Sequence, residues 1–296
     1  MDQHTNSDQP PSEASLLPHA RFTLVLLLTV GFFACNDRQE FKPLKSAGIT
    51  PADSMVKPVA AAPAKPAKKK KKIYLTFDDG PNLGTPNVLH IVREEQIPVT
   101  FFVIGEHTAA SRLQQATWDS LRNLPLAELC NHSYSHAWRN RYNKFYASPD
   151  SVVKDFDQTR EMLQLDNHIA RTPGRNAWRI DSLKFTDNAK SRTAVDSLQQ
   201  AGYTVVGWDL EWHFNPKTLN VTADADQLVR QIDTLFARNR TKRPDNLVIL
   251  AHDQAYRGTP DTIELRKLIR KIKQNDNYEF AVVSSYPGVP QKPAPR

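Results

Sequence analysis

Short apolar runs alternate with segments of helical periodicity between residues 73 and 285. Each run holds four to six residues and is rich in β-branched, aliphatic and aromatic side chains, which is typical of buried strands. The runs comprise residues 73–77, 99–104, 127–130, 203–208, 247–251 and 280–283. Such alternation of strands and helices predicts a parallel sheet, either open or closed into a barrel.

Three of the intervening segments have clear helix signals. The first covers residues 149–163, with Ser148 as N-cap and Pro149 at the first helical position. The second follows Thr222 and the third follows Thr259. Their apolar residues recur at helical spacing, which predicts one buried face on each helix. These residues are Leu228, Ile232 and Leu235 in the second helix, and Leu265, Leu268, Ile269 and Ile272 in the third.

The N-terminal part of the chain has the pattern of an exported protein. Residues 22–34 form an apolar run that is short for a bilayer span but has the length of a secretory signal core. The sequence Gly31-Phe-Phe-Ala-Cys35 is similar to the lipobox of bacterial lipoproteins. We therefore expect residues 1–35 to be a signal/lipoprotein segment, lipidated at Cys35. An uncleaved signal anchor is the alternative, and both predict a membrane-attached protein of the bacterial cell envelope, facing the periplasm or the cell surface.

Composition divides the rest of the chain. Residues 36–72 are rich in Pro, Ala and Lys, which predicts a disordered linker, and residues 286–296 predict a disordered tail. The catalytic domain is expected at residues 73–285. The net charge is +7, but Lys65 and the run Lys68 to Lys72 supply six of those charges, which leaves about +1 elsewhere. No basic face for nucleic acid is therefore expected, and nothing implies an obligate protein partner.

Two polar motifs carry the candidate chemistry. Asp78 and Asp79 follow the apolar run 73–77, and His132 and His136 follow the run 127–130. Side chains four residues apart on a helical turn lie about 5–6 Å apart, so two such imidazoles can bind one ion. One carboxylate and two histidines leave the fourth position of zinc open to water, as catalytic zinc requires. The second carboxylate is then free to act as a base, because neighbouring residues of an extended segment point to opposite sides.

Other reactive side chains also follow predicted strands. Arg171 follows a short one, Glu211 and Trp212 follow the run 203–208, and His252 closes the run 247–251. Barrel enzymes build their sites at the C-terminal ends of their strands. The sequence thus predicts one site that draws on residues far apart in the chain.

The region between residues 73 and 285 resembles the polysaccharide deacetylases of carbohydrate esterase family 4, the NodB-homology fold, in five ordered motifs. These are Thr76-Phe-Asp-Asp-Gly-Pro81, Asn131-His-Ser-Tyr-Ser-His136, Arg171-Thr-Pro-Gly174, Glu211-Trp212 and Leu250-Ala-His252. The resemblance implies an α/β fold, a distorted (β/α) barrel of seven or eight strands, and one divalent metal ion, most often Zn²⁺.

The resemblance also implies a role for each matching residue. The metal ligands are Asp79, His132 and His136. Asp78 is the catalytic base and Arg171 the arginine that orients it. His252 is the general acid, which suits a group that titrates near neutral pH.

Two positions depart from the family pattern. Glu211 stands where an aspartate normally partners the acid histidine, with Asp209 as the other candidate. Gly174 supplies the backbone amide of the oxyanion site, where the family normally carries an aromatic residue. The glycine keeps the amide but lacks the side chain that forms a wall of the pocket. We expect Trp178 to replace that wall and Trp212 to bind substrate.

Together these features predict a hydrolase acting on carbon–nitrogen bonds other than peptide bonds. It would remove N-acetyl groups from N-acetylglucosamine units of an envelope polysaccharide, either peptidoglycan or a chitin-like glycan. Two alternatives stay open: an O-acetyl esterase acting on a xylan-like glycan, and a non-catalytic glycan-binding protein on the same fold. A phosphate-handling enzyme is not indicated, because no glycine-rich phosphate loop or second acid two residues on lies near Asp78.

Overall fold

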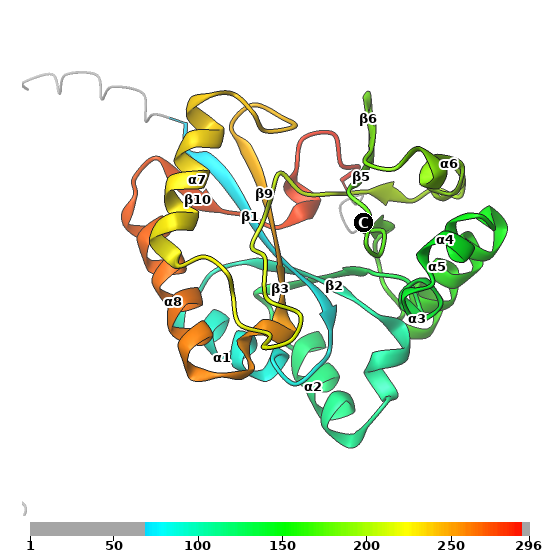
Figure 1. Ribbon diagram of the computed structural model, residues 1–296, viewed down its shortest axis with the longest axis horizontal. Helices are drawn as coiled ribbons and strands as arrows, with labels where there is room; N and C mark the ends of the chain where they lie inside the picture. Colours follow the sequence, from blue (N-terminus) through cyan, green and yellow to red (C-terminus); the bar gives the residue numbers. More distant parts are fainter. Residues whose placement is uncertain (1–68, 292–296) are drawn as a thin grey trace, which may run out of the picture. The chain divides into compact units, whose positions relative to one another are not determined.

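The computed structural model describes residues 69–291 (Figure 1). Within them a ten-stranded sheet has the order β6-β5-β7-β4-β3-β2-β1-β9-β8, and β10 also pairs with β1. The strands are β1 (Lys71–Gly80), β2 (Val99–Val103), β3 (Ala127–Asn131), β4 (Ile169–Ala170), β5 (Ala177–Ile180), β6 (Leu183–Thr186), β7 (Thr204–Val205), β8 (Leu210–Glu211), β9 (Asn246–His252) and β10 (Tyr278–Phe280).

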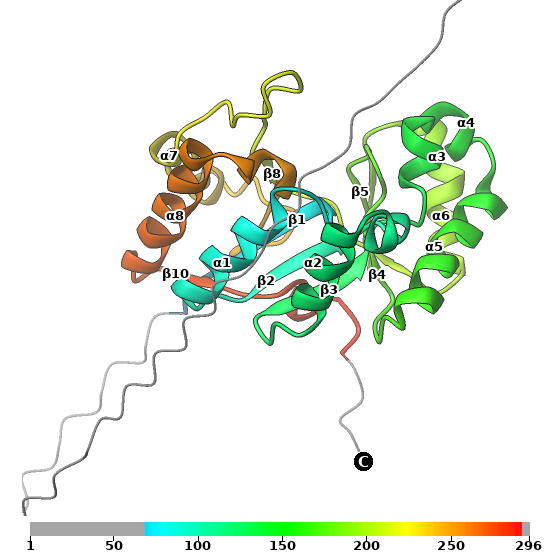
Figure 2. The same cartoon turned by 90° about the horizontal axis from the view of Figure 1, so that it is seen from below.

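Helices flank the sheet on both sides (Figure 2). They are α1 (Thr85–Glu95), α2 (Arg112–Arg122), α3 (His136–Asn140), α4 (Tyr142–Tyr146), α5 (Pro149–Leu163), α6 (Arg192–Gln200), α7 (Ala225–Ala237) and α8 (Thr259–Gln274), with short 3₁₀ turns at Gly105–Ala109, Ala189–Ser191, Asp253–Arg257 and Val283–Ser285. Figure 2 shows α3, α4, α5 and α6 grouped at one end of the sheet and α1, α7 and α8 at the other. The curled sheet with its helices confirms the predicted distorted (β/α) barrel.

The alternation of side chains along β1 organises the core. Ile73, Leu75 and Phe77 are fully buried against helices α1 and α8. Thr76 and Asp78 alternate with them along the strand, so they face the opposite, concave side of the sheet. All four predicted apolar residues of α8 are buried in the same cluster as these β1 side chains. This packing fixes the direction in which β1 delivers its two carboxylates.

Several predicted elements match the structure closely. Helix α5 has the predicted bounds and begins after Ser148, although the Ser148 side chain makes no capping hydrogen bond. Helix α7 begins after a capping box formed by Asp224 and Gln227. Its buried face includes Leu228 and Ile232 as predicted and also Phe236, and the predicted Leu235 is partly buried against the same core.

Two features of the sheet differ from the prediction. Only Thr204 and Val205 of the run 203–208 pair in the sheet, because the next two carbonyl oxygens accept hydrogen bonds from Arg171 instead, at 3.1 and 2.9 Å. Strands β5 and β6 form a hairpin that the apolar pattern did not indicate. Strand β5 pairs antiparallel with both β6 and β7, so the sheet is mixed and not wholly parallel.

The packed core also extends past the expected boundary at residue 285. Tyr286 and Val289 are buried, and the Tyr286 ring lies edge-on to Tyr74 with 5.2 Å between centroids. Those residues therefore belong to the domain and not to a disordered tail. The signal segment with Cys35 and nearly all of the predicted linker lie outside the described residues. Within residues 69–291, the helices are too short or too polar to cross a membrane.

Helix α8 offers a matched test of this packing. Leu268 is fully buried and Ile263, on the same helix, is 56% exposed. We expect Leu268→Ala to lower the free energy of unfolding by about 2–5 kcal/mol, because it leaves a cavity in the core. Ile263→Ala should change it by no more than about 0.5 kcal/mol. Urea denaturation followed by circular dichroism measures both, and equal effects would contradict the packing described for α8.

Candidate active site

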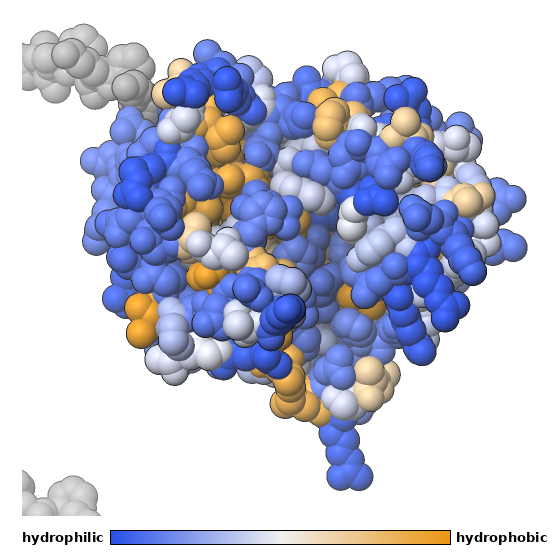
Figure 3. Space-filling view, in the orientation of Figure 1, coloured by the Kyte–Doolittle hydropathy of each residue, from blue (hydrophilic) through white to orange (hydrophobic). Residues whose placement is uncertain are grey.

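The predicted site residues converge at the C-terminal ends of β1, β3 and β9. Asp78 and Asp79 lie near the C-terminal end of β1, His132 follows β3 directly, and His252 ends β9. The register pairs Asp78 with His252 across the β1–β9 ladder. The face seen in Figure 3 is mostly hydrophilic, with apolar side chains exposed in small groups.

Asp79 occupies a bulge in β1. The β1–β2 register shifts between Asp78 and Gly80, so Asp79 has no partner in that ladder, and its backbone has φ +74°. The expectation that the two carboxylates point to opposite sides is therefore wrong, because the segment is not extended at Asp79. Both carboxylates approach His132 Nε2, with Asp79 Oδ1 at 3.3 Å and Asp78 Oδ2 at 3.7 Å.

The two histidines do not share a helical turn, contrary to the spacing argument. His132 to Ser135 form a loop after β3, in which Ser133 has φ +68°. All five residues of α3 then have positive φ, from +46° at His136 to +66° at Asn140, so this turn is left-handed. A left-handed turn costs roughly 1–2 kcal/mol per non-glycine residue, and such strain persists only where surrounding contacts impose it.

Asp155 of α5 supplies those contacts. Its carboxylate accepts the N–H groups of Tyr134 and Ser135 at 2.9 and 3.1 Å, and the Ser135 hydroxyl at 2.7 Å. The Ser135 hydroxyl in turn accepts the N–H of Trp138. A buried carboxylate on a regular helix therefore shapes the loop that carries His132 and His136.

Asp79, His132 and His136 form a cluster suited to a metal ion. The three ligand atoms lie within 4.8 Å of one another, and Asp79 Oδ1 is 3.3 Å from His132 Nε2 and 3.2 Å from His136 Nε2. Tetrahedral zinc with bonds of about 2.0–2.1 Å separates its ligands by about 3.3 Å. Asp79 Oδ1 is buried and has no hydrogen-bond partner among the described residues. An orphaned carboxylate oxygen between two imidazole nitrogens fits a cation.

The far nitrogens of both imidazoles are held by acceptors. His132 Nδ1 lies 2.9 Å from the Arg171 carbonyl oxygen, and His136 Nδ1 lies 2.6 Å from Asn140 Oδ1. Because these acceptors require a protonated Nδ1, each Nε2 is left as the metal-binding nitrogen. Sequence reasoning missed Asn140. Asn140 lies four positions after His136, but this spacing alone does not predict the contact, which depends on the left-handed turn.

The electrostatics of the cluster agree with this arrangement. Burial acts to raise the pKa of Asp79, but contacts with His132 and His136 hold that pKa well below its usual value. Burial acts to lower the pKa of His136, and the contact with Asp79 raises it overall. Asp79 therefore stays ionised, and His136 must give up any proton on Nε2 before it can bind a metal ion.

Arg171 is completely buried and positions Asp78. It donates to Asp78 Oδ1 at 2.8 Å and, from the same nitrogen, to Thr76 Oγ1 at 2.6 Å. Its other nitrogens donate to the carbonyls of Val206 and Gly207. The carboxylate is thus held by one hydrogen bond from the guanidinium and not by two parallel ones, because the remaining donors satisfy the backbone.

His252 faces the cluster, but its predicted partner does not reach it. His252 Nε2 lies 4.0 Å from Asp79 Oδ2, and the ring packs edge-on against Phe214. His252 Nδ1 is buried without a partner among the described residues. Glu211 pairs in register with Leu250, two residues short of His252, and its carboxylate lies 3.2 Å from His213 Nδ1.

Asp209 does not fill that place either. Its carboxylate accepts the N–H groups of Lys242 and Val248, at 2.7 and 2.9 Å, so it closes the loop before β9. Among the described residues neither Glu211 nor Asp209 orients the imidazole of His252. The predictions that Glu211, or alternatively Asp209, is the partner of His252 are therefore wrong in this structure.

The two tryptophans expected to line the pocket are buried. Trp178 is 0% exposed and donates through Nε1 to Asn176, and Trp212 is 1% exposed and donates to the carbonyl of Ala223. Neither ring has a face available to a sugar, so both expectations are wrong in this structure. Gly174 is exposed with φ +61°, and among the described hydrogen bonds none uses its N–H.

Asp253 is a further buried group that sequence reasoning missed, although it directly follows His252. Its carboxylate accepts hydrogen bonds from Asn82 and Thr85, which tie the loop after β1 to the end of β9. Burial raises the pKa of Asp253 to about 7; those two hydrogen bonds oppose the shift, and the charges of Asp79 and Asp78 add to it. The pKa of this carboxyl group therefore depends on the charges of Asp78 and Asp79.

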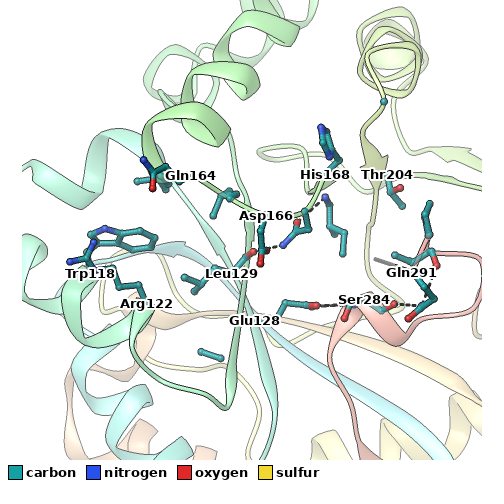
Figure 4. A pocket seen from close by; sticks show the side chains of 18 residues that line it. Trp118, Arg122, Glu128, Leu129, Gln164, Asp166, His168, Thr204, Ser284 and Gln291 are labelled. Carbon is teal, nitrogen blue, oxygen red and sulfur yellow. Dashed lines mark hydrogen bonds between the residues drawn. The ribbon is translucent and has the colours of Figure 1, made fainter. Parts of the chain in front are cut away.

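A separate hollow of about 820 Å³ lies at the N-terminal ends of β3, β4 and β7, away from the acid–histidine cluster (Figure 4). Its lining includes Trp118, Glu128 and His168, and Glu128 there accepts the N–H of Ser284. None of the four clustered acids and histidines borders it. The chemistry therefore lies at the C-terminal ends of the strands, as expected for a barrel enzyme.

The curled (β/α) barrel carries an acid–histidine cluster at the C-terminal ends of its strands, which is the arrangement expected of a hydrolase. The sequence model described as polysaccharide deacetylase matches residues 65–206. A chitooligosaccharide deacetylase of Rhizobium leguminosarum is 42% identical over 151 residues, 47% of this chain and 60% of that protein. A peptidoglycan-N-acetylglucosamine deacetylase of Bacillus cereus is 27% identical over 217 residues, 73% of this chain and 87% of that protein.

Solved structures agree on the fold. The catalytic domain of a peptidoglycan N-acetylglucosamine deacetylase from Eubacterium rectale superposes with a TM-score of 0.53 at 21% identity, over 80% of this chain and 99% of that one. A family 4 carbohydrate esterase from Streptomyces lividans gives 0.51 at 18% identity, over 75% and 97%. The chain is therefore similar, over somewhat less than half of its length in the family match, to the polysaccharide deacetylases, hydrolases that act on carbon–nitrogen bonds other than peptide bonds.

The raised pKa of Asp253 predicts a pH dependence of stability. Between the unfolded value near 3.9 and the folded value of about 7, the native state binds more protons than the unfolded state. The free energy of unfolding of the metal-free protein should therefore fall as pH rises from 5 to 7.5, by an amount on the order of 2–3 kcal/mol from this group.

Urea unfolding of the metal-free protein at the two pH values measures this fall. Asp253→Asn removes the titrating group, so its stability should change less between them. The exposed Asp276→Asn is the control and should behave as the native chain does. An Asp253→Asn protein that loses as much stability as the native chain would rule out this carboxyl group as the source.

Proposed function

We propose that this protein is a metal-dependent deacetylase that hydrolyses N-acetyl groups of N-acetylglucosamine units in an envelope polysaccharide, either peptidoglycan or a chitin-like glycan. The observation that carries the proposal is the cluster of Asp79, His132 and His136 with Asp78 beside it. The related deacetylases of Rhizobium and Bacillus cereus support this substrate class.

The metal ligands in this proposal are Asp79, His132 and His136. A divalent cation held by these residues, most simply Zn²⁺, would supply Lewis-acid chemistry: it would polarise an acyl carbonyl and lower the pKa of water to about 7. The donor set of one carboxylate and two imidazoles suits zinc and leaves a coordination position for water.

The remaining steps fall to the residues around the cluster. Asp78 accepts the proton of the attacking water, and Arg171 holds that carboxylate in position through a hydrogen bond of 2.8 Å. The N–H of Gly174 donates to the oxygen that becomes negatively charged in the tetrahedral intermediate. His252 gives a proton to the amine nitrogen as it leaves, because an amine is a poor leaving group unless protonated. The products are acetate and a free amino sugar.

Attachment to the membrane through Cys35 belongs to the same proposal. A lipid anchor or a signal anchor, followed by an extended linker, would keep the domain close to envelope glycans. The apolar run and the lipobox-like sequence support it. Metabolic labelling with a palmitate analogue, compared between the native chain and Cys35→Ser, tests lipidation directly.

Release of acetate from chitopentaose and from acetylated peptidoglycan tests the activity. We expect release that is lost on treatment with EDTA and restored by Zn²⁺. Asp78→Asn should lower kcat at least about 100-fold while zinc stays bound, because it removes the base and keeps the ligands. His132→Ala should lose zinc as well as activity, which mass spectrometry of bound metal measures.

Other outcomes separate the alternatives. Release from acetylxylan alone would favour the O-acetyl esterase. Binding of glycans without release from any acetylated substrate would favour the non-catalytic glycan-binding protein, which the departures at Gly174 and Glu211 make a specific alternative. In either case the N-deacetylase proposal would be abandoned.

A further inference from the structure

Tyr142 lies between the metal cluster and the proposed oxyanion donor. It begins α4, two residues after the left-handed turn. Its ring packs edge-on against the His136 ring, with 6.0 Å between centroids. On its other side the ring lies against Gly174. A side chain in this position borders the place where the reacting carbonyl would bind.

The ring occupies the volume that position 174 leaves open. A Cβ atom placed on Gly174 would lie 2.7 Å from Cε1, 2.9 Å from Cζ and 3.2 Å from Cδ1 of Tyr142. Contacts below 3.0 Å are sterically excluded, so a side chain at position 174 and the present position of Tyr142 are incompatible. The aromatic wall missing from position 174 is thus supplied from α4, a different element of the chain.

Two further contacts hold the ring in place. The Tyr142 hydroxyl donates to Asn140 Oδ1 at 2.9 Å, the same oxygen that accepts the N–H of His136. The Arg175 guanidinium lies 5.7 Å from the ring centroid. Tyr142 is still only partly buried, so some of its ring surface faces the solvent. By contrast, Trp178 and Trp212 have no exposed surface to offer a sugar.

We propose that Tyr142 is a substrate-binding residue whose ring, which lies between His136 and Gly174, packs against the pyranose that carries the acetamide group. This inference rests on the proposed function of the site. It assigns the sugar contact to an aromatic residue outside the five sequence motifs. It also explains how the chain tolerates glycine at position 174.

The first test compares a glycan with a small ester. Tyr142→Ala should raise KM for chitopentaose about tenfold, the size of one lost aromatic contact, with kcat within about twofold. Hydrolysis of 4-nitrophenyl acetate, which has no sugar, should change by less than about twofold. Tyr142→Phe keeps the ring and should stay within about threefold of the native KM. Trp118→Ala, at the remote hollow, is the matched aromatic control and should leave both substrates unaffected.

The second test is a double-mutant cycle. Gly174→Ala alone should raise KM, because its Cβ displaces the ring of Tyr142. Added to Tyr142→Ala, the same change should raise KM much less than it does alone, because the clash with the ring has gone and only the backbone strain of alanine at φ +61° remains. Additive effects of the two changes, or equal losses on glycan and small ester, would overturn the proposal. Bound zinc and melting temperature are measured for every variant.

Binding separates this proposal from the activity itself. Isothermal titration of chitopentaose into Asp78→Asn, with and without Tyr142→Ala, reports the sugar contact in a protein that does not turn over. We expect about tenfold weaker binding when the ring is absent. If the native chain releases no acetate but this difference remains, the proposed function fails and the role of Tyr142 stands. If the difference is absent, the role of Tyr142 fails.

Discussion

A full positive charge buried at the centre of a curled sheet is the constraint on which the site depends. Arg171 is 0% exposed, and its guanidinium lies 4.0 Å from the centroid of the Phe102 ring. Burial of an unpaired charge would cost many kcal/mol, so every donor must find an acceptor. Asp78, Thr76 and two backbone carbonyls supply them. The same contacts end the pairing of β7 and hold the proposed base in place.

The cluster of Asp79, His132 and His136 depends on strain that is imposed from outside it. Asp79 has φ +74° at a bulge, and the left-handed turn from His136 to Asn140 is unfavourable in isolation. Asp155 on α5 holds the preceding loop, and Asp253 after β9 holds the loop that follows β1. Carboxylates on or directly after regular elements therefore hold two loops in place. The proposed metal ligands lie in these loops or next to them. Such an arrangement keeps ligand atoms 3.2–3.3 Å apart without a regular helix beneath them.

Much of the fold could be predicted because local patterns report burial directly. The stripe of α8 and the bounds of α5 follow from apolar spacing and from Pro149 at the helix start. The β5–β6 hairpin could not be predicted, since Arg179 and Lys184 interrupt its apolar pattern while Arg179 pairs with Asp196 across elements. The predicted partnership of Glu211 with His252 is wrong because it depends on strand register, which a match of sequence motifs does not contain. In the structure Glu211 pairs with Leu250, two residues before His252.

The sequence by itself determined the types of the site residues and their order: two carboxylates, two imidazoles, an arginine and a final histidine, each after an apolar run. Those are chemical identities, and they need no coordinates. Only the tertiary structure decided which atoms meet. Backbone turns with positive φ, at Asp79 and from His136 to Asn140, are set by contacts from distant helices and strands. The space beside Gly174 is likewise occupied by the Tyr142 ring from α4. Which side chain fills a space depends on the tertiary packing and not on its position in a sequence motif.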